Sequence, residues 1–450
     1  MAKNEEEIKN ARTFLKFYFF ELTPLILKRR YFFADCAFFI NPEKFSHKRE
    51  KQKIKSKMKK NVSLLLALLS LSFCVQTQDK VEKIMEDGVE VIVNHLEPYK
   101  IKDELTALTL KEEFVIDLEK EEIAAIGLDD VWGFDVNSEG DIYLFKPITS
   151  QGDLIYRFDQ KGNFISSFAH RGQGPGEVEH PAYQKINSQD ELPITYPSRS
   201  KIMIFNKDGN LAEEINMDLF IGYFGNMVYP LENGNYLIRR TLRTPYRGIT
   251  FALGLFNPEF KEIKELDRFK TIQPIRSVKY RLPMHVSVWC VSNKNIYVGN
   301  EERGYEIWVY DFDGNLLRKI RKNYQADNGS GKLEQEIREK LKDSPQVLKD
   351  KIYFPERWPP FQFIFADDKA RLYVMTFKEG KNPNENIFDI FNPEGIFITT
   401  ASMHVSLNDP FFTPGVPLDS WVTIKKNRLY CLREKSSGYR EFVVYKTIWN

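Results

Sequence analysis

Arginine and aromatic side chains gather in two stretches of this sequence that have the composition of loops. RRTLRTPYRG (239–248) contains four arginines and a tyrosine, and FPERWPPF (354–361) places an arginine beside a tryptophan. Guanidinium groups make paired hydrogen bonds to carboxylates, and aromatic rings offer a surface for stacking. These residue types predict a site for an acidic ligand. The candidate ligand-binding residues are Arg171, Gln173, Glu177, Arg240, Arg243, Tyr246, Arg247, Arg357 and Trp358.

Three histidines suggest an alternative in which the protein is an enzyme. His180, His285 and His404 would have to converge as ligands of one divalent metal ion, as in a propeller lyase or a lactonase-like hydrolase. The sequence contains no HxH or HxxxH pair, and no GxSxG elbow, P-loop, CxxC pair or HExxH motif. We therefore assign no catalytic residue and no cofactor, and favour a non-catalytic binding or scaffold protein over the metal-dependent enzyme.

The charge balance argues against a nucleic-acid partner. The whole chain carries 65 Lys and Arg against 63 Asp and Glu. The part before Cys74 contains 16 of the basic and 7 of the acidic residues, so the rest has 49 basic and 56 acidic residues and a net charge of −7. Nucleic-acid binding needs a basic surface. The expected partner is a small molecule, a glycan or a protein, and we expect a monomer.

An export signal is indicated by a segment that starts at Met58. MKKNVSLLLALLSLSFC (58–74) combines two lysines, an apolar run from Val62 to Phe73 and small residues at its end. The run is too short to span a bilayer comfortably. Cys74 is a candidate lipidation site, and ordinary signal cleavage is the alternative. The expected location is outside the cytoplasm, either periplasmic, secreted or lipid-anchored at a bacterial envelope, with the lipid as the only contact to a membrane.

The residues on either side of this signal have less definite roles. Residues 1–57 are interpreted as an upstream extension from a wrongly assigned start, with an amphipathic surface segment as the alternative. Residues 75–110 are expected to form a linker. Of the four cysteines, Cys290 and Cys431 follow the signal, which is too few for a disulfide framework.

One pattern recurs from Asp129 to the end of the chain. Each unit has a strand, a polar turn, a short strand ending in Ile-Tyr or Leu-Tyr, a third strand, a turn built on Asp or Asn, and a last strand. Four strands in about 40–50 residues are typical of propeller blades. The turns before the last strands begin 47, 51, 54 and 81 residues apart, so the last interval indicates an insertion of about 30 residues. These turns begin at Asp159, Asn206, Asn257, Asp311 and Asn392.

The final unit stops after its third strand. EEFVIDL (112–118), ahead of the first unit, can supply the missing outer strand, which closes a ring and removes the sheet edges. The sequence therefore predicts an all-β fold: a six-bladed β-propeller of four-stranded antiparallel blades over residues 111–450, with a helical insertion at 323–360 between blades 4 and 5. On this interpretation DVNSEGD (135–141), which is similar to part of a calcium loop, is the turn between the first two strands of blade 1.

The connector after the first unit carries a family resemblance. Gly172-Gln173-Gly174-Pro175-Gly176-Glu177, followed by Pro181, resembles the GQGPGE connector of bacterial six-bladed β-propellers of the NHL-like type. The resemblance covers roughly residues 110–450. It implies binding or scaffolding outside the cytoplasm more often than one named reaction, because propellers host many functions.

The expected blades have two faces. Connectors between blades and loops between second and third strands lie on one side, here called the connector face, and the two other turns of each blade lie on the opposite turn face. All candidate residues above were expected on the connector face. Leu333, Ile337 and Leu341 recur at i, i+4, so the insertion is expected to form helix and a partial lid there. Arg357 and Trp358 would then close over a ligand; in the alternative, Trp358 packs the helix down and the arginines are solvated.

Overall fold

The computed structural model describes residues 81–450 apart from short internal gaps, and all of these residues belong to one compact unit. The gaps are 148–149, 175, 179–182, 197–200, 218–226, 245–247, 272–278, 284–285, 293, 326–330, 381, 383–384, 406–420 and 436.

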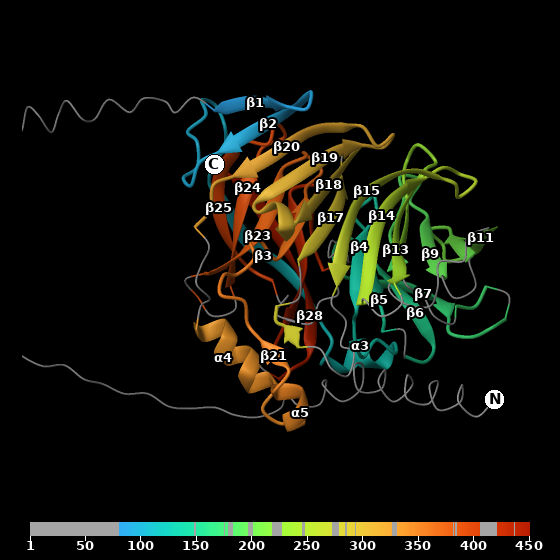
Figure 1. Cartoon of the computed structure of the whole chain (residues 1–450). Helices are drawn as coiled ribbons and strands as arrows, with labels where there is room; N and C mark the ends of the chain where they lie inside the picture. Colours follow the sequence, from blue (N-terminus) through green and yellow to red (C-terminus); the bar gives the residue numbers. More distant parts are fainter. Residues whose placement is uncertain are drawn as a thin grey trace, which may run out of the picture. The chain divides into compact units, whose positions relative to one another are not determined.

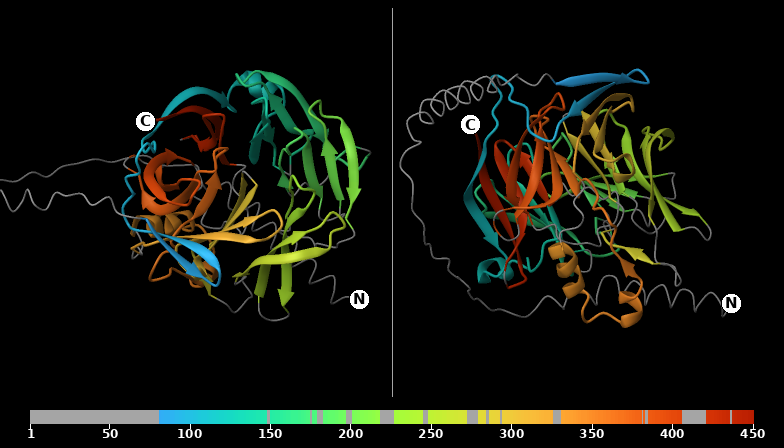
Figure 2. Two further views of the ribbon diagram at one scale, coloured as in Figure 1. Left: turned by 90° about the horizontal axis from the view of Figure 1, so that it is seen from above. Right: turned by 60° about the vertical axis from the view of Figure 1, so that its left-hand side comes forward.

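The described chain forms a six-bladed β-propeller (Figure 1). Each blade is an antiparallel sheet, and the sheets lie side by side around a common centre in the left view of Figure 2. Blade 1 is β4 (Gly133–Val136), β5 (Ile142–Phe145), β6 (Asp153–Phe158) and β7 (Phe164–His170). Blade 2 is β8 (Tyr183–Gln184), β9 (Leu192–Tyr196), β10 (Lys201–Phe205) and β11 (Leu211–Asn216). Blade 3 is β12 (Met227–Pro230), β13 (Tyr236–Thr244), β14 (Gly248–Phe256) and β15 (Glu262–Thr271).

The second half of the ring follows the same order. Blade 4 contains β17 (Ser287–Ser292), β18 (Asn295–Asn300), β19 (Glu306–Asp311) and β20 (Leu316–Lys322). Blade 5 is β22 (Phe363–Ala366), β23 (Leu372–Glu379), β24 (Glu385–Phe391) and β25 (Phe397–His404). Blade 6 is β26 (Val422–Lys425), β27 (Arg428–Glu434), β28 (Arg440–Trp449) and the N-terminal strand β3 (Leu108–Asp117), which pairs antiparallel with β28.

Each pair of neighbouring blades shares its own apolar core. Between blades 6 and 1, for example, Phe134 of β4 packs edge-on against Phe442 of β28 with ring centroids 4.8 Å apart. Alternate residues of a strand face opposite sides of its sheet, so every blade buries one face against each neighbour. The ring is therefore held by six separate clusters of buried side chains rather than by one central core.

The turns between third and fourth strands share one construction. In blade 1 the Asp159 carboxylate accepts from the backbone N–H groups of Lys161 and Asn163, both at 2.8 Å. Gly162, the residue before Asn163, has φ = 84°, in the region that glycine tolerates without steric cost. In blade 3 the equivalent position is Phe260, with φ = 57°. The recurrent Asp or Asn therefore forms the turn even where glycine is absent.

The segment expected as a linker forms a β-hairpin, which corrects that prediction. Strands β1 (Glu82–Glu86) and β2 (Val89–Asn94) are joined by Asp87 and Gly88, both with positive φ. Strand β2 pairs parallel with β20, so blade 4 becomes a six-stranded sheet. An Asp-Gly pair between strand-like runs is a recognised hairpin signal, although it does not say which sheet the hairpin joins.

Asn94 ties the end of this hairpin to two blades. Its side chain is fully buried and donates to the backbone carbonyls of Arg321 in blade 4, at 3.2 Å, and Gly395 in blade 5, at 3.0 Å. It also accepts from the backbone N–H of Phe397 at 2.8 Å. The N-terminal segment thus closes the outer end of the seam between blades 4 and 5.

Helices α3 (Glu121–Ala125), α4 (Gly331–Lys340) and α5 (Gln346–Lys349) lie at the lower side of Figure 1. Helix α3 precedes blade 1, and α4 and α5 lie between β20 and β22. A short strand of the insertion, β21 (Ile352–Tyr353), pairs parallel with β16 (Tyr280–Arg281) of the preceding connector. A 3-10 turn spans Glu301–Arg303. Within the described part of the chain, no helix has the length and apolar character needed to cross a bilayer.

Candidate ligand-binding cavity

A cavity of about 600 Å³ lies at the centre of the turn face. Its wall takes residues from all six blades, mostly at the ends of the inner strands and in the turns that follow them. This volume falls within the range of about 300–1,000 Å³ that is usual for small-molecule sites. The face is the one opposite to the connector face predicted from the sequence.

Two lysines and one aspartate form the deep wall of this cavity. Asp135 lies in β4, Lys185 directly follows β8, and Lys425 ends β26, so three blades contribute. The Asp135 carboxylate accepts from Lys425 Nζ at 2.9 Å, and Lys185 Nζ lies 3.5 Å from the same oxygen. Its second oxygen accepts from the backbone N–H of Ile186 at 2.8 Å. Both lysines line the cavity, whereas Asp135 is fully buried behind them.

The charge of Asp135 is set by this environment. Burial alone would raise the pKa of its carboxyl, but the ammonium groups of Lys185 and Lys425 and the hydrogen bonds outweigh burial and hold the pKa below its ordinary value. Asp135 is therefore ionised at neutral pH. Two ammonium groups with one carboxylate give the deep wall a net charge of +1.

The charged side chains at the rim of the cavity carry a net negative charge. Exposed Lys294 and Lys426 are accompanied there by Glu232, Asp190 and Asp368. Asp368 accepts from the backbone N–H of Lys426 at 2.8 Å. These five groups sum to −1. The positive charge of the cavity is thus concentrated at its buried end, where solvent screens a charge less than at the surface.

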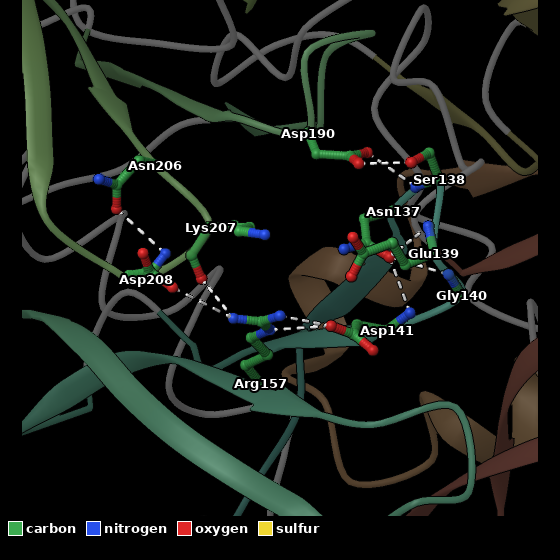
Figure 3. A network of polar contacts seen from close by, with 10 residues as sticks. All are labelled: Asn137, Ser138, Glu139, Gly140, Asp141, Arg157, Asp190, Asn206, Lys207 and Asp208. Atoms are coloured by element: carbon green, nitrogen blue, oxygen red, sulfur yellow. Dashed lines mark hydrogen bonds and ion pairs between the residues drawn. The ribbon is translucent and has the colours of Figure 1, made fainter.

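The turn that follows Asp135 in the chain, residues 137–141, is joined to blade 2 by a network of polar contacts (Figure 3). Asn137 Oδ1 accepts from the backbone N–H groups of Gly140 at 2.9 Å and Asp141 at 2.8 Å. Asp141 pairs with Arg157 Nε at 3.0 Å, and Arg157 donates to the carbonyl of Lys207 in blade 2 at 2.7 Å. The side chain that resembled a calcium ligand, Asp141, is therefore engaged by a guanidinium group, as expected for a turn.

A second contact joins the same two blades at the cavity itself. Asp190 of blade 2 accepts from the backbone N–H of Ser138 at 2.7 Å and also from the Ser138 hydroxyl. Blades 3 and 4 supply the aromatic, largely apolar part of the wall: Tyr229, Pro230, Leu231 and Tyr236 from blade 3, and Val291 and Phe312 from blade 4.

Two of the arginines predicted on the connector face, Arg171 and Arg240, have local partners. Arg171 donates to the carbonyl of Ser150 at 3.0 Å. Arg240 lies within strand β13 and pairs with Glu262 at 2.6 Å, so it is not a loop residue. Arg357 is exposed. The side chain of Arg243, together with Tyr246 and Arg247, lies outside the described residues.

The GQGPGE connector is organised by its glutamate. Glu177 Oε2 accepts from the backbone N–H of Gly174 at 2.8 Å. A Cβ atom at Gly172 would lie 1.9 Å from the same oxygen, so a larger residue there would displace the Glu177 carboxylate. Gln173 is exposed. The carboxylate of Glu177 therefore shapes its own loop, and its predicted role in ligand binding stays a prediction.

Trp358 takes the packing role that the sequence left as the alternative. Its indole is 3% exposed and packs with Leu282, Ile337 and Leu341 beneath helix α4. Its ring centroid lies 5.3 Å from that of Phe377. A side chain this deeply buried offers no stacking surface in this conformation, so the expectation that Trp358 contacts ligand is not supported.

Of the three proposed metal ligands the structure describes only His404, so their convergence stays a prediction. His404 ends β25, and burial lowers its pKa, helped by the nearby charge of Arg433. His180, His285 and the lipidation candidate Cys74 lie outside the described residues. Among the residues that are described, no group of three or more His, Cys, Asp or Glu side chains is arranged to hold a metal ion.

Sequence reasoning missed Asp135, Lys185 and Lys425, although a signal for two of them exists. Asp135 and Lys185 each precede by two residues an asparagine, Asn137 or Asn187, whose side chain caps the first turn of its blade. Equal positions in adjacent blades lie side by side at the centre of a propeller. Lys425 is also followed two residues later by an asparagine, Asn427, but Asn427 Oδ1 accepts from Lys369 Nζ at 2.8 Å, whereas Asn137 and Asn187 accept from backbone N–H groups of their own turns.

Comparison with known proteins supports the fold. Residues 136–266 match the model of a family described as a 6-bladed beta-propeller, DUF5128. No curated protein matches the sequence.

Similar solved structures include three bacterial proteins. One is described as a "Putative exported protein" from Bacteroides fragilis, with 10% identity, a TM-score of 0.44, and coverage of 80% of this chain and 99% of that one. A member of the DUF4221 family from Bacteroides vulgatus has 12% identity and a TM-score of 0.46, covering 77% of this chain and 100% of that one. Virginiamycin B lyase from Staphylococcus aureus has 11% identity and a TM-score of 0.36, covering 76% and 100%.

Proposed function

We propose that this propeller is a non-catalytic binding protein that holds a small acidic ligand in the turn-face cavity. The observation that carries the proposal is the position of Lys185 and Lys425, which line the cavity in front of the buried Asp135. A carboxylate that enters from the rim would meet two ammonium groups held from behind. Charge-assisted hydrogen bonds of this kind are about twice as strong as neutral ones.

Asp135 acts in this proposal as a positioning residue. It fixes the two lysines by a 2.9 Å and a 3.5 Å contact, and it is itself fixed by the backbone of Ile186. A site whose charges are already placed loses less side-chain freedom when a ligand binds. The carboxylate of the ligand would add a second negative charge to two positive ones, which balances the deep wall.

The test is calorimetric titration of the protein with two carboxylates, 3-phenylpropionate and D-galacturonate, and with galactose as a neutral counterpart. We expect binding of at least one carboxylate and none of galactose. Lys425→Met should weaken that binding about tenfold or more, because it removes one of the two ammonium groups. Lys446→Met, at an exposed lysine of β28 away from the cavity, is the matched control. Absence of carboxylate binding, or unchanged affinity in Lys425→Met, would overturn the proposal.

We further propose that the protein works outside the cytoplasm, with a mature N-terminus at Cys74 or Val75. The support is the signal-like segment 58–74, with its lysines and its apolar run. Intact-mass spectrometry of the protein purified from its native envelope tests this. A lipid mass on Cys74 would identify the lipid-anchored form, and a mature chain that starts at Met1 would refute export by this signal.

A further inference from the structure

We propose that the ligand of the turn-face cavity is amphipathic, with a carboxylate at one end and an aromatic or otherwise apolar body at the other. This inference rests on the proposed function and adds the chemical class of the ligand. It comes from the unequal distribution of side chains around the cavity wall.

The lysines and the aromatic side chains of the wall come from different blades. The lysines come from blades 2 and 6, which flank blade 1, whereas the aromatic side chains that line the cavity come from blades 3 and 4. The apolar side chains that the other blades add are aliphatic: Val136, Ile186, Ala366 and Ile424. In a ring of six blades, blade 4 lies opposite blade 1 and blade 3 lies opposite blade 6. A ligand that fills the cavity would therefore touch the lysines with one end and the apolar wall with the other.

The apolar wall is supported from behind, so it keeps its shape without a ligand. Tyr236 stacks on Phe260 with ring centroids 4.7 Å apart and an angle of 25° between the planes. The backbone carbonyl of Phe312 accepts from Asn233 Nδ2 and Asn235 Nδ2, both at 3.1 Å. The two asparagine contacts cross from blade 3 to blade 4, whereas the stack of Tyr236 on Phe260 lies within blade 3. A preformed apolar surface binds an apolar group at low cost in conformational entropy.

The two ends together exclude simpler ligands as the best fit. A wholly polar acid, such as a sugar acid, would place hydroxyl groups against Leu231, Val291 and Phe312, where they find no hydrogen-bond partner in those side chains. A neutral aromatic molecule would bury the two lysines without a new counter-charge. A molecule with both features satisfies both walls, so we expect it to bind tighter than either.

Calorimetry with matched probes tests this class. The probes are 3-phenylpropionate, D-galacturonate and the neutral 3-phenylpropionamide. We expect 3-phenylpropionate to bind about tenfold or more tighter than each of the others, because burial of one phenyl ring contributes at least that factor. Val291→Ser and Tyr236→Ala should each reduce this preference, and leave any D-galacturonate binding unchanged. Tyr439→Ala, at an exposed tyrosine on the connector face, is the control and should change nothing.

Each other outcome has a distinct meaning. If D-galacturonate binds as tightly as 3-phenylpropionate, or tighter, the amphipathic class is wrong while the acidic-ligand function stands. If 3-phenylpropionamide binds as tightly as 3-phenylpropionate, the lysines do not recognise the carboxylate, and both the proposed function and the inference are overturned. If no probe binds, both fall. If Val291→Ser and Tyr236→Ala, confirmed as folded by circular dichroism, keep the full preference, the apolar wall is not the contact and the inference is overturned.

Discussion

The two faces of this propeller place the partners of their charged residues differently. On the connector face Arg281 and Glu301 lie side by side at 2.7 Å, and Trp358 is buried under the insertion. On the turn face the carboxylate of Asp135 is buried behind two lysines that line a cavity. On the connector face Arg281 and Glu301 neutralise each other. On the turn face Asp135 fixes the two lysines from behind, and their ammonium groups still line the cavity. The position of the counter-charge is therefore a better guide to a binding site than the number of arginines in a loop.

The largest change in stability should follow from substitution of Trp358, the buried tryptophan of the connector face. Trp358→Ala removes a buried indole from the contact between α4 and blade 5, and we expect a loss of about 3–5 kcal/mol in the free energy of unfolding. Urea denaturation followed by circular dichroism measures it. Arg357→Ala, the exposed neighbour, should change stability by less than about 0.5 kcal/mol. A Trp358→Ala protein of normal stability would show that this face is not held together as described.

Asp135→Asn should have the next largest effect, on the turn face. It leaves Lys185, almost completely buried, and Lys425 without the charge that holds them, and we expect a loss of about 3 kcal/mol. Glu262→Gln removes the partner of Arg240 where both side chains are partly exposed, and should cost less than about 1 kcal/mol. Denaturation of the two variants in parallel compares an ion pair buried behind the cavity with a partly exposed one. Equal losses would mean that burial behind the cavity adds nothing to the ion pair.

The same carboxylate should give the turn face an acid-sensitive part of its stability. The pKa of Asp135 is lower in the folded protein than in the unfolded chain, so its contribution is complete above the unfolded value of 3.8 and is lost as pH falls through the lower folded value. The stability difference between wild type and Asp135→Asn should therefore shrink between about pH 5 and about pH 2. Denaturant midpoints at several pH values measure it. A constant difference across this range would contradict the ionised state of Asp135.

The smallest expected effect is a pH-dependent change in stability from His404, at the edge of the connector face. Burial lowers the pKa of His404, so the neutral ring stabilises the fold above the unfolded value of 6.5, and this stability is lost as pH falls through the folded value. Between about pH 7.5 and about pH 5.5, the melting temperature of His404→Gln should therefore fall slightly less than that of the wild type. His170→Gln, an exposed histidine beside Asp153, serves as the comparison. An identical pH response of wild type and His404→Gln would contradict the assigned shift.

The architecture was predictable because its signals are local. The turn that begins at Asp159 recurs at Asn206 and Asp311 with the same hydrogen bonds, and such turns can be counted along a sequence. The cavity was not predictable in the same way. Lys425 meets Asp135 across 290 residues, and that meeting depends on the closure of the ring and on the register of two inner strands. No spacing rule encodes either of these.

The prediction of an arginine site did not take into account that residues of outer strands can pair with the arginines. Glu262 lies only 22 residues from Arg240, yet its position opposite the arginine follows from the pairing of β13 with β14 and of β14 with β15, including shifts of register in the second pairing. The side chain was expected in a loop because arginines cluster there in the sequence. In the structure it belongs to a strand.

The two strands at the start of the described chain also bear on how the molecule reaches its folded state. Strand β3 completes blade 6 by pairing Asp117 with Glu441, and β2 joins blade 4 by pairing Glu90 with Arg318. During synthesis from the N-terminus, both strands must remain without these partners until residues more than two hundred positions later have emerged. Loops of this length close slowly, so we expect ring closure to be the late, rate-limiting event of folding. Until then the strand edges of blades 4 and 6 are open to other chains, and this stage is the one at which the protein is most exposed to aggregation and most dependent on chaperones.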